Sequence, residues 1–185
     1  MTKLYNLGIR DKCHLFLKNL YLSSKARAFF NGNLSEEISI NRGVRQGCPP
    51  LSPNLFNLFL NDVLDNCDKY VVYLDSQYCC DGLFANDIVL VAPSKQALKK
   101  ILNIVHEWTI KNEMTFGIYK CVTLVVKPIN FVKPKNYEDP SFFIDSNKLP
   151  KTDNYTYLDI PFDESLSLKP IQSKLNSNLN VKLNL

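Results

Sequence analysis

A short polar step between two apolar runs is one of two places in this sequence where side chains could do chemistry. Asn86 and Asp87 stand between the apolar residues 82–85 and 88–91. Two turn-forming polar residues between apolar strands predict a tight β-hairpin with Asn86 and Asp87 at its tip. A carboxylate held there could bind a hard cation such as Mg²⁺, whereas asparagine offers only a neutral carbonyl oxygen. By itself, Asp87 reads as a plain turn residue.

The second place is the loop that contains Arg45, Gln46 and Gly47. Arginine and glutamine present planar hydrogen-bond donors that suit a phosphate or a base, and glycine lets the backbone approach a ligand closely. The Ser52-Pro53 step that follows predicts the start of a helix, with serine as the N-cap and proline in the first turn. One face of this helix is apolar (Leu55, Phe56, Phe59, Leu60, Val63 and Leu64), and the other carries Asn54, Asn57, Asn61 and Asp65.

The loop and its helix together resemble a known signature. Residues 43–53 read GVRQGCPPLSP, and residues 54–62 read NLFNLFLND. This run resembles the reverse transcriptases of non-LTR (LINE-like) retrotransposons, whose pattern is GVRQGCPLSP followed by LFNLYIND; this sequence has one additional proline, at Pro49 or Pro50. Residues 83–90, LFANDIVL, fall where that family carries its (F/Y)ADD hairpin. A match of this length is specific enough for us to expect the family.

The resemblance implies nucleotidyl transfer by a two-metal mechanism, because the adjacent aspartates of the family's hairpin hold the catalytic magnesium ions. It assigns Asp87 as a catalytic metal ligand and puts Asn86 in the place of the first aspartate, with one negative charge fewer. It also assigns Arg45, Gln46 and Gly47 to contacts with the template and the incoming nucleotide. A further metal-binding aspartate belongs to an upstream motif, which we expect to be absent because the segment that should follow it begins at residue 3. We therefore expect an inactive or strongly impaired site.

Two weaker matches extend the resemblance toward the C-terminus. The run from Trp108 to Cys121 looks like the family's helix and following strand, where a lysine at the position of Lys120 approaches the nucleotide phosphates. A solvated lysine at the start of a strand fits equally well. Residues 155–160, YTYLDI, resemble the family's YLG segment near the primer strand, with Asp159 where glycine is usual. A carboxylate sits poorly beside a phosphate backbone.

The remaining patterns predict the elements that position these residues. Apolar spacing predicts helices over residues 11–21 and 94–112, and Asn31-Gly32 predicts the turn of a hairpin over residues 26–40. We expect a strand over 121–126, a loop over 128–140, a strand pair formed by 142–144 with 155–160, and a closing helix from residue 171. Helices that alternate with antiparallel hairpins predict an α+β fold.

The resemblance makes this fold a partial polymerase palm. It implies a palm-like antiparallel sheet with packed helices over residues 1–160, followed by the start of the thumb or a C-terminal helix over residues 161–185. We expect the fingers and the first palm strand to be missing.

Composition narrows the class of protein only a little. The 185 residues are 45% hydrophobic, enough for a core, and the formal net charge of +4 is too mild to indicate nucleic-acid binding by itself. The six cysteines have no Cys-x-x-Cys spacing and the two histidines are isolated, which argues against a zinc site. No apolar run is long enough for a membrane span, and because a polar, mixed-charge stretch follows Met1 we expect no signal sequence there. We expect no membrane partner and an intracellular setting, cytoplasmic or nuclear.

Three functions follow from these patterns. The first is a fragment of an RNA-directed DNA polymerase of a non-LTR retrotransposon, inactive or impaired, whose implied partners are an RNA template, a DNA primer, a dNTP and Mg²⁺. The second is a non-catalytic module, derived from a reverse transcriptase, that binds RNA or an RNA–DNA duplex. The third is an interaction protein unrelated to nucleic acid, which rests only on the generic pattern of helices and hairpins.

Overall fold

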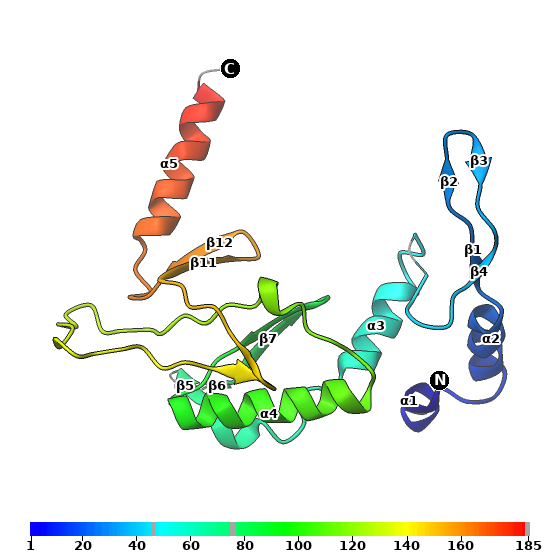
Figure 1. Ribbon diagram of the computed structural model, residues 1–185, viewed down its shortest axis with the longest axis horizontal. Helices are drawn as coiled ribbons and strands as arrows, with labels where there is room; N and C mark the ends of the chain where they lie inside the picture. The colour runs from blue at the N-terminus through cyan, green and yellow to red at the C-terminus, as the bar shows by residue number, and fades with distance from the viewer. Residues whose placement is uncertain (46, 75–76, 184–185) are drawn as a thin grey trace. The chain divides into compact units, whose positions relative to one another are not determined.

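The structure is a computed structural model, which describes every residue except 46, 75–76 and 184–185 (Figure 1). The chain divides into two compact units: Met1–Asp65 with Asp81–Val89, and Asn66–Cys80 with Leu90–Leu185. No boundary between these units falls at residue 160. The division into palm and thumb at that residue stays a prediction.

Three helices form the core of the first unit: α1 (Thr2–Asn6), α2 (Asp11–Leu22) and α3 (Ser52–Leu60). Leu4, Leu17 and Leu55, one from each helix, are buried against one another. Lys3 of α1 also reaches the end of α3, where its Nζ donates a hydrogen bond to the Phe59 carbonyl oxygen at 2.9 Å. The two helices predicted for this part of the chain are therefore present.

A long hairpin follows α2, as the Asn31-Gly32 step predicted. β1 (Lys25–Ala26) pairs with β4 (Ile38–Ser39), and β2 (Phe29–Phe30) pairs with β3 (Asn33–Leu34), both antiparallel. Asn31 and Gly32 have positive φ angles of 47° and 79°, which is the backbone of a type I′ turn. Figure 1 shows this hairpin rising from the end of α2.

The second unit is organised around α4 (Lys95–Lys111). Ser94 is its N-cap and accepts a hydrogen bond from the Ala97 amide at 3.1 Å, which explains why the helix begins there. The predicted apolar face is buried, since Ile101 is 0% and Val105 is 2% exposed. Leu102 on the same face packs against three buried residues that follow the helix: Phe142, Ile144 and Leu149.

Short hairpins make up much of the rest of this unit. After the 3-10 helix η1 (Asp68–Tyr70), β5 (Val72–Leu74) pairs with β6 (Gln77–Cys79). β9 (Phe143–Ile144) pairs with β10 (Asn147–Lys148), and β11 (Asn154–Tyr157) pairs with β12 (Ile160–Asp163). The predicted pairing of residues 142–144 with 155–160 is therefore wrong, because each segment pairs with its own neighbour in the sequence.

The predicted strand over residues 121–126 is also wrong. A 3-10 helix, η2 (Ile118–Lys120), precedes this segment, and Thr123 then forms an isolated parallel bridge with Lys151. Residues 128–140 form the predicted loop. The predicted closing helix is α5 (Lys169–Leu183).

The described strands form two-stranded sheets, six in number. Helices mixed with small antiparallel sheets agree with the predicted α+β class, whereas the larger palm sheet stays a prediction. Within the described residues, no helix is both long enough and apolar enough to cross a membrane.

Candidate functional site

The Asn86-Asp87 step lies in a hairpin, as the sequence predicted, but the turn is one residue earlier than predicted. β7 (Asp81–Phe84) pairs with β8 (Asp87–Leu90), so Ala85 and Asn86 form the turn and Asp87 is the first residue of a strand. Ala85 has a φ of 51°, a left-handed backbone that costs a residue with a Cβ roughly 1–2 kcal/mol. Backbone strain of this kind tends to occur at functional sites.

The β7–β8 turn offers few oxygen atoms that could bind a metal ion. Asn86 and Asp87 are exposed, so a ligand can reach them. In the part of the chain that the structure describes, no three His, Cys, Asp or Glu side chains come together in a way that could hold a metal ion. Asp87 supplies one carboxylate and Asn86 one amide oxygen, whereas two magnesium ions need several charged oxygen ligands. The described residues do not fit a pair of magnesium ions.

The loop before α3 is shaped by glycine. Gly43 and Gly47 have φ angles of 91° and 79°, which residues with a Cβ adopt only with strain. Apart from Gly47 and its two chain neighbours, no atom of the described residues lies within 4 Å of the position that a Cβ would take on Gly47, so within the chain this glycine serves the turn. Gln46, which the resemblance assigned to the template or nucleotide, lies outside the described residues.

Arg45 is exposed, but its guanidinium contacts the end of α2. Its Nη2 donates to the Leu20 carbonyl oxygen at 2.9 Å and to Ser24 Oγ at 3.1 Å, and its Nε donates to Ser24 Oγ at 3.3 Å. On the other side of the loop, the Ser52 hydroxyl donates to the Arg45 carbonyl oxygen. The N-cap of α3 is Leu51, so the predicted capping role of Ser52 is wrong. The Ser52 hydroxyl instead fixes the backbone of the loop at Arg45.

Lys120 lies in the second unit, whereas Arg45, Gly47, Asn86 and Asp87 belong to the first. It ends the 3-10 helix η2 and does not begin a strand. Its Nζ lies 5.7 Å from the centroid of the neighbouring Tyr119 ring, a cation–π contact. The approach of Lys120 to nucleotide phosphates stays a prediction.

Asp159 stands where the family usually has glycine, and together with Leu158 it forms the turn between β11 and β12. Leu158 and Asp159 have φ angles of 47° and 67° between β11 and β12. The Asp159 carboxylate forms an ion pair with Lys174 of α5, whose Nζ also donates to the Asp159 carbonyl oxygen at 2.5 Å. The Asp159 carboxylate, which would be repelled by a phosphate backbone, is therefore paired with the Lys174 ammonium in this chain.

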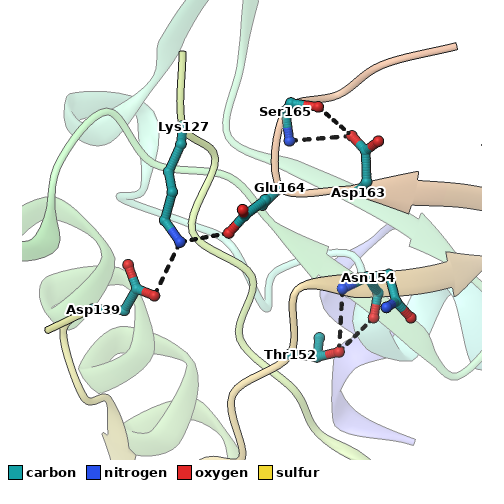
Figure 2. Close-up of polar contacts among 7 residues, drawn as sticks. All are labelled: Lys127, Asp139, Thr152, Asn154, Asp163, Glu164 and Ser165. Atoms are coloured by element: carbon teal, nitrogen blue, oxygen red, sulfur yellow. Dashed lines mark hydrogen bonds and ion pairs between the residues drawn. The ribbon is translucent and has the colours of Figure 1, made fainter. Parts of the chain in front are cut away.

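The second unit contains a shielded ion pair that no sequence pattern had indicated (Figure 2). The Lys127 side chain is only 10% exposed, and its Nζ lies 2.5 Å from Glu164 Oε2 and 3.1 Å from Asp139 Oδ2. The hydrogen bond with Glu164 raises the pKa of Lys127 and keeps the ammonium charged. Burial alone would raise the pKa of Asp139, but hydrogen bonding, first of all with Lys127, holds that pKa below its ordinary value. No local spacing could have indicated these contacts, because the partners are 12 and 37 residues away.

A cavity of about 440 Å³ lies beside this ion pair, between the loop that begins at Lys127 and the ends of β11 and β12. Asp163 borders the cavity but is engaged locally: its carboxylate accepts hydrogen bonds from the amides of Ser165 and Ser167 at 3.1 Å and 2.8 Å, and from both hydroxyls. These bonds lower the pKa of Asp163 to about 2. Glu164 and Asp163, two of the carboxylates that line the cavity, are therefore engaged by partners within the chain.

Residues 1–161 match the family model for reverse transcriptase (RNA-dependent DNA polymerase). This match spans well over half of the chain, so the chain belongs to the reverse transcriptase family. Proteins of this family bind a nucleic-acid template and a primer and depend on divalent metal ions. Residues 43–62 and the β7–β8 hairpin, which carried the resemblance, both lie within the matched residues.

Proposed function

We propose that this chain is part of a reverse transcriptase of the non-LTR retrotransposon type, and that its polymerisation step is lost or strongly impaired. The observation that carries the proposal is the β7–β8 turn, where Asn86 stands in the place of a metal-binding aspartate beside Asp87. The retrotransposon type is supported by residues 43–62, which follow the pattern of that group.

The physical reason for the impairment is charge. A two-metal site must hold two doubly charged ions close together, and its carboxylates offset their mutual repulsion. An amide in place of a carboxylate removes one full negative charge and leaves a weaker oxygen ligand. In the described residues no cluster of acidic side chains compensates for this loss.

The test is primer extension by the 185-residue chain on an RNA template with a DNA primer, first with Mg²⁺ and then with Mn²⁺. We expect no incorporation of nucleotides above background with either metal. An active reverse transcriptase on the same template and primer serves as the control for the substrate. Robust incorporation by this chain overturns the proposal.

A second function, binding of an RNA–DNA duplex without catalysis, is supported by the net charge of +4 and by the loop around Arg45, which the protein itself holds in place. We propose that this binding takes place inside the cell, in the cytoplasm or the nucleus. Affinity should fall steeply as the salt concentration rises, because cationic side chains release counterions from the phosphates. The absence of any shift of a duplex at low salt overturns this second function.

A further inference from the structure

We infer that Arg45 is a positioning residue: it fixes the described residues 41–45 and 47–51, here called the Arg45 loop, between the end of α2 and the start of α3. In this role it affects nucleic acid only through the shape of that loop. This inference rests on the proposed binding of nucleic acid. A surface arginine next to a glycine turn in a protein of this family would otherwise be expected to touch a phosphate directly.

The first observation is the geometry of the guanidinium. Nε and Nη2, which form one edge of the group, both donate to Ser24 Oγ, at 3.3 Å and 3.1 Å. Nη2 also donates to the Leu20 carbonyl oxygen at 2.9 Å. A carboxylate or phosphate is commonly gripped by two parallel N–H groups on one edge of a guanidinium. In this structure the Nε and Nη2 edge is already occupied by acceptors from the protein.

The second observation is the burial of the two serines on either side of the loop. Ser24 is 8% exposed and Ser52 is 6% exposed, and both bond to Arg45. Ser24 accepts from its side chain, whereas Ser52 donates to its carbonyl oxygen. The Ser24 hydroxyl also donates to the Leu20 carbonyl oxygen at 3.4 Å, so it keeps a partner of its own. A buried hydroxyl without a partner costs about 1–3 kcal/mol, so Ser52 favours the loop conformation in which the Arg45 carbonyl oxygen accepts its hydrogen bond.

The third observation is that Ser24 also fixes the start of the loop. Its carbonyl oxygen accepts a hydrogen bond from the Ile40 amide at 2.8 Å, immediately before residue 41. The start of the loop and Arg45 within it are thus tied to the same serine. Beyond Arg45, Gly47 supplies the left-handed turn that leads the chain to α3.

A direct contact and a positioning role predict different behaviour. An arginine that neutralises a phosphate contributes about 0.7–0.9 to the slope of log affinity against log salt, and its loss lowers that slope by a similar amount. A positioning arginine changes affinity but leaves the slope unchanged. Ser24 is too buried to meet a phosphate, so Ser24→Ala should weaken binding only if the loop is positioned through Ser24.

The experiment measures binding of an RNA–DNA duplex across salt concentrations, and amide hydrogen exchange of residues 43–51, for six chains. Five are the original chain, Arg45→Ala, Arg45→Lys, Ser24→Ala and the double variant Ser24→Ala with Arg45→Ala. The sixth, Arg27→Ala, is the matched control, because it removes the same charge from an exposed arginine of the same unit. Circular dichroism verifies that each variant is folded.

We expect the Arg45 and Ser24 single variants each to weaken binding about tenfold with an unchanged salt slope, and to speed exchange in the Arg45 loop, whereas Arg27→Ala should leave this exchange unchanged. Arg45→Lys should bind no better than Arg45→Ala, because an ammonium cannot reproduce the planar donors Nε and Nη2 of arginine. The double variant should be no worse than either single variant, since both break the same contact. The inference is overturned if Arg45→Ala lowers the salt slope by about one unit while Ser24→Ala binds normally.

The exchange measurement separates this inference from the proposed function. If the original chain binds no duplex at low salt, the proposed binding fails, but the positioning role is still decided by exchange. Unchanged exchange over residues 43–51 in Arg45→Ala, relative to Arg27→Ala, overturns the positioning role whatever the binding result.

Discussion

Lys127 and Glu164 are joined twice. Lys127 Nζ lies 2.5 Å from Glu164 Oε2, and the Lys127 amide donates to the Glu164 carbonyl oxygen at 2.6 Å. Because the residues are 37 apart in the sequence, this double link fastens the end of β12 to the segment that enters the long loop. The Lys127 side chain is largely shielded from solvent, so salt screens the pair less than it would screen a surface pair.

Replacing Lys127 with methionine should lower the melting temperature by several degrees. The variant keeps most of the apolar stem but takes the Lys127 cation away from the Asp139 and Glu164 carboxylates, and a partly shielded charge that loses its cation is destabilising. Thermal unfolding followed by circular dichroism measures the change. The same substitution at the exposed Lys135 is the control and should have little effect. Equal losses in the two variants would contradict the role of the shielded pair.

Stability should depend on pH through Asp163. Its pKa in the folded chain is about 2, below the ordinary value of 3.8, because Ser167 and Ser165 donate hydrogen bonds to its charged form. A depressed pKa contributes stability that is present above the unfolded pKa and is lost as the pH falls through the folded value. The difference in stability between the original chain and Asp163→Asn should therefore shrink as the pH falls from 3.8 toward 2. A difference that stays constant over this window in thermal unfolding argues against the prediction.

Replacing Ala85 with glycine should stabilise the β7–β8 hairpin by about 0.5–1 kcal/mol. Glycine relieves the cost of the left-handed φ of 51°, and its larger entropy in the unfolded chain offsets part of the gain. Urea denaturation measures the free energy of unfolding. Ala92→Gly is the matched control, since Ala92 does not have a positive φ, and it should lose stability. A loss in both variants would show that the turn is not strained.

Replacing Ser94 with alanine should destabilise the second unit by about 1 kcal/mol. The hydroxyl satisfies the Ala97 amide, one of the four amides at the start of a helix that lack a partner within the helix. Urea denaturation is again the measurement. Ser173→Ala, at an exposed position inside α5, should change the free energy of unfolding by less than about 0.5 kcal/mol. If the two variants have the same free energy of unfolding, the Ser94 cap contributes nothing to stability.

Replacing Asn86 with aspartate should tighten the binding of Mn²⁺ severalfold without restoring primer extension by the 185-residue chain. The change returns one charged oxygen ligand beside Asp87, but two carboxylates are still few for two metal ions. Asn86→Ala is the control for metal binding, which calorimetry can measure. Nucleotide incorporation by the aspartate variant would show that the remaining ligands are already present in this chain.

Local sequence patterns predicted the elements whose stability is local. The Ser94 cap, the apolar face of α4 and the Asn31-Gly32 turn act over a few residues, so their spacing was sufficient. The β7–β8 turn was misplaced by one residue, because adjacent registers place similar residues in the turn and cross-strand pairing decides between them. The pairing of residues 142–144 was wrong for the same reason, since a strand pattern does not say which strand is its partner.

By itself the sequence determined the reverse transcriptase family and the residue types at the candidate site: residues 43–62 and 83–90 carry the resemblance, and position 86 is asparagine. The tertiary structure decided what Arg45 and Lys127 do. Leu20 and Ser24 lie 25 and 21 residues before Arg45, and Glu164 lies 37 residues after Lys127. Charge and hydrogen-bonding capacity belong to the side chain, but which groups satisfy them depends on how distant segments pack, and no local spacing encodes that.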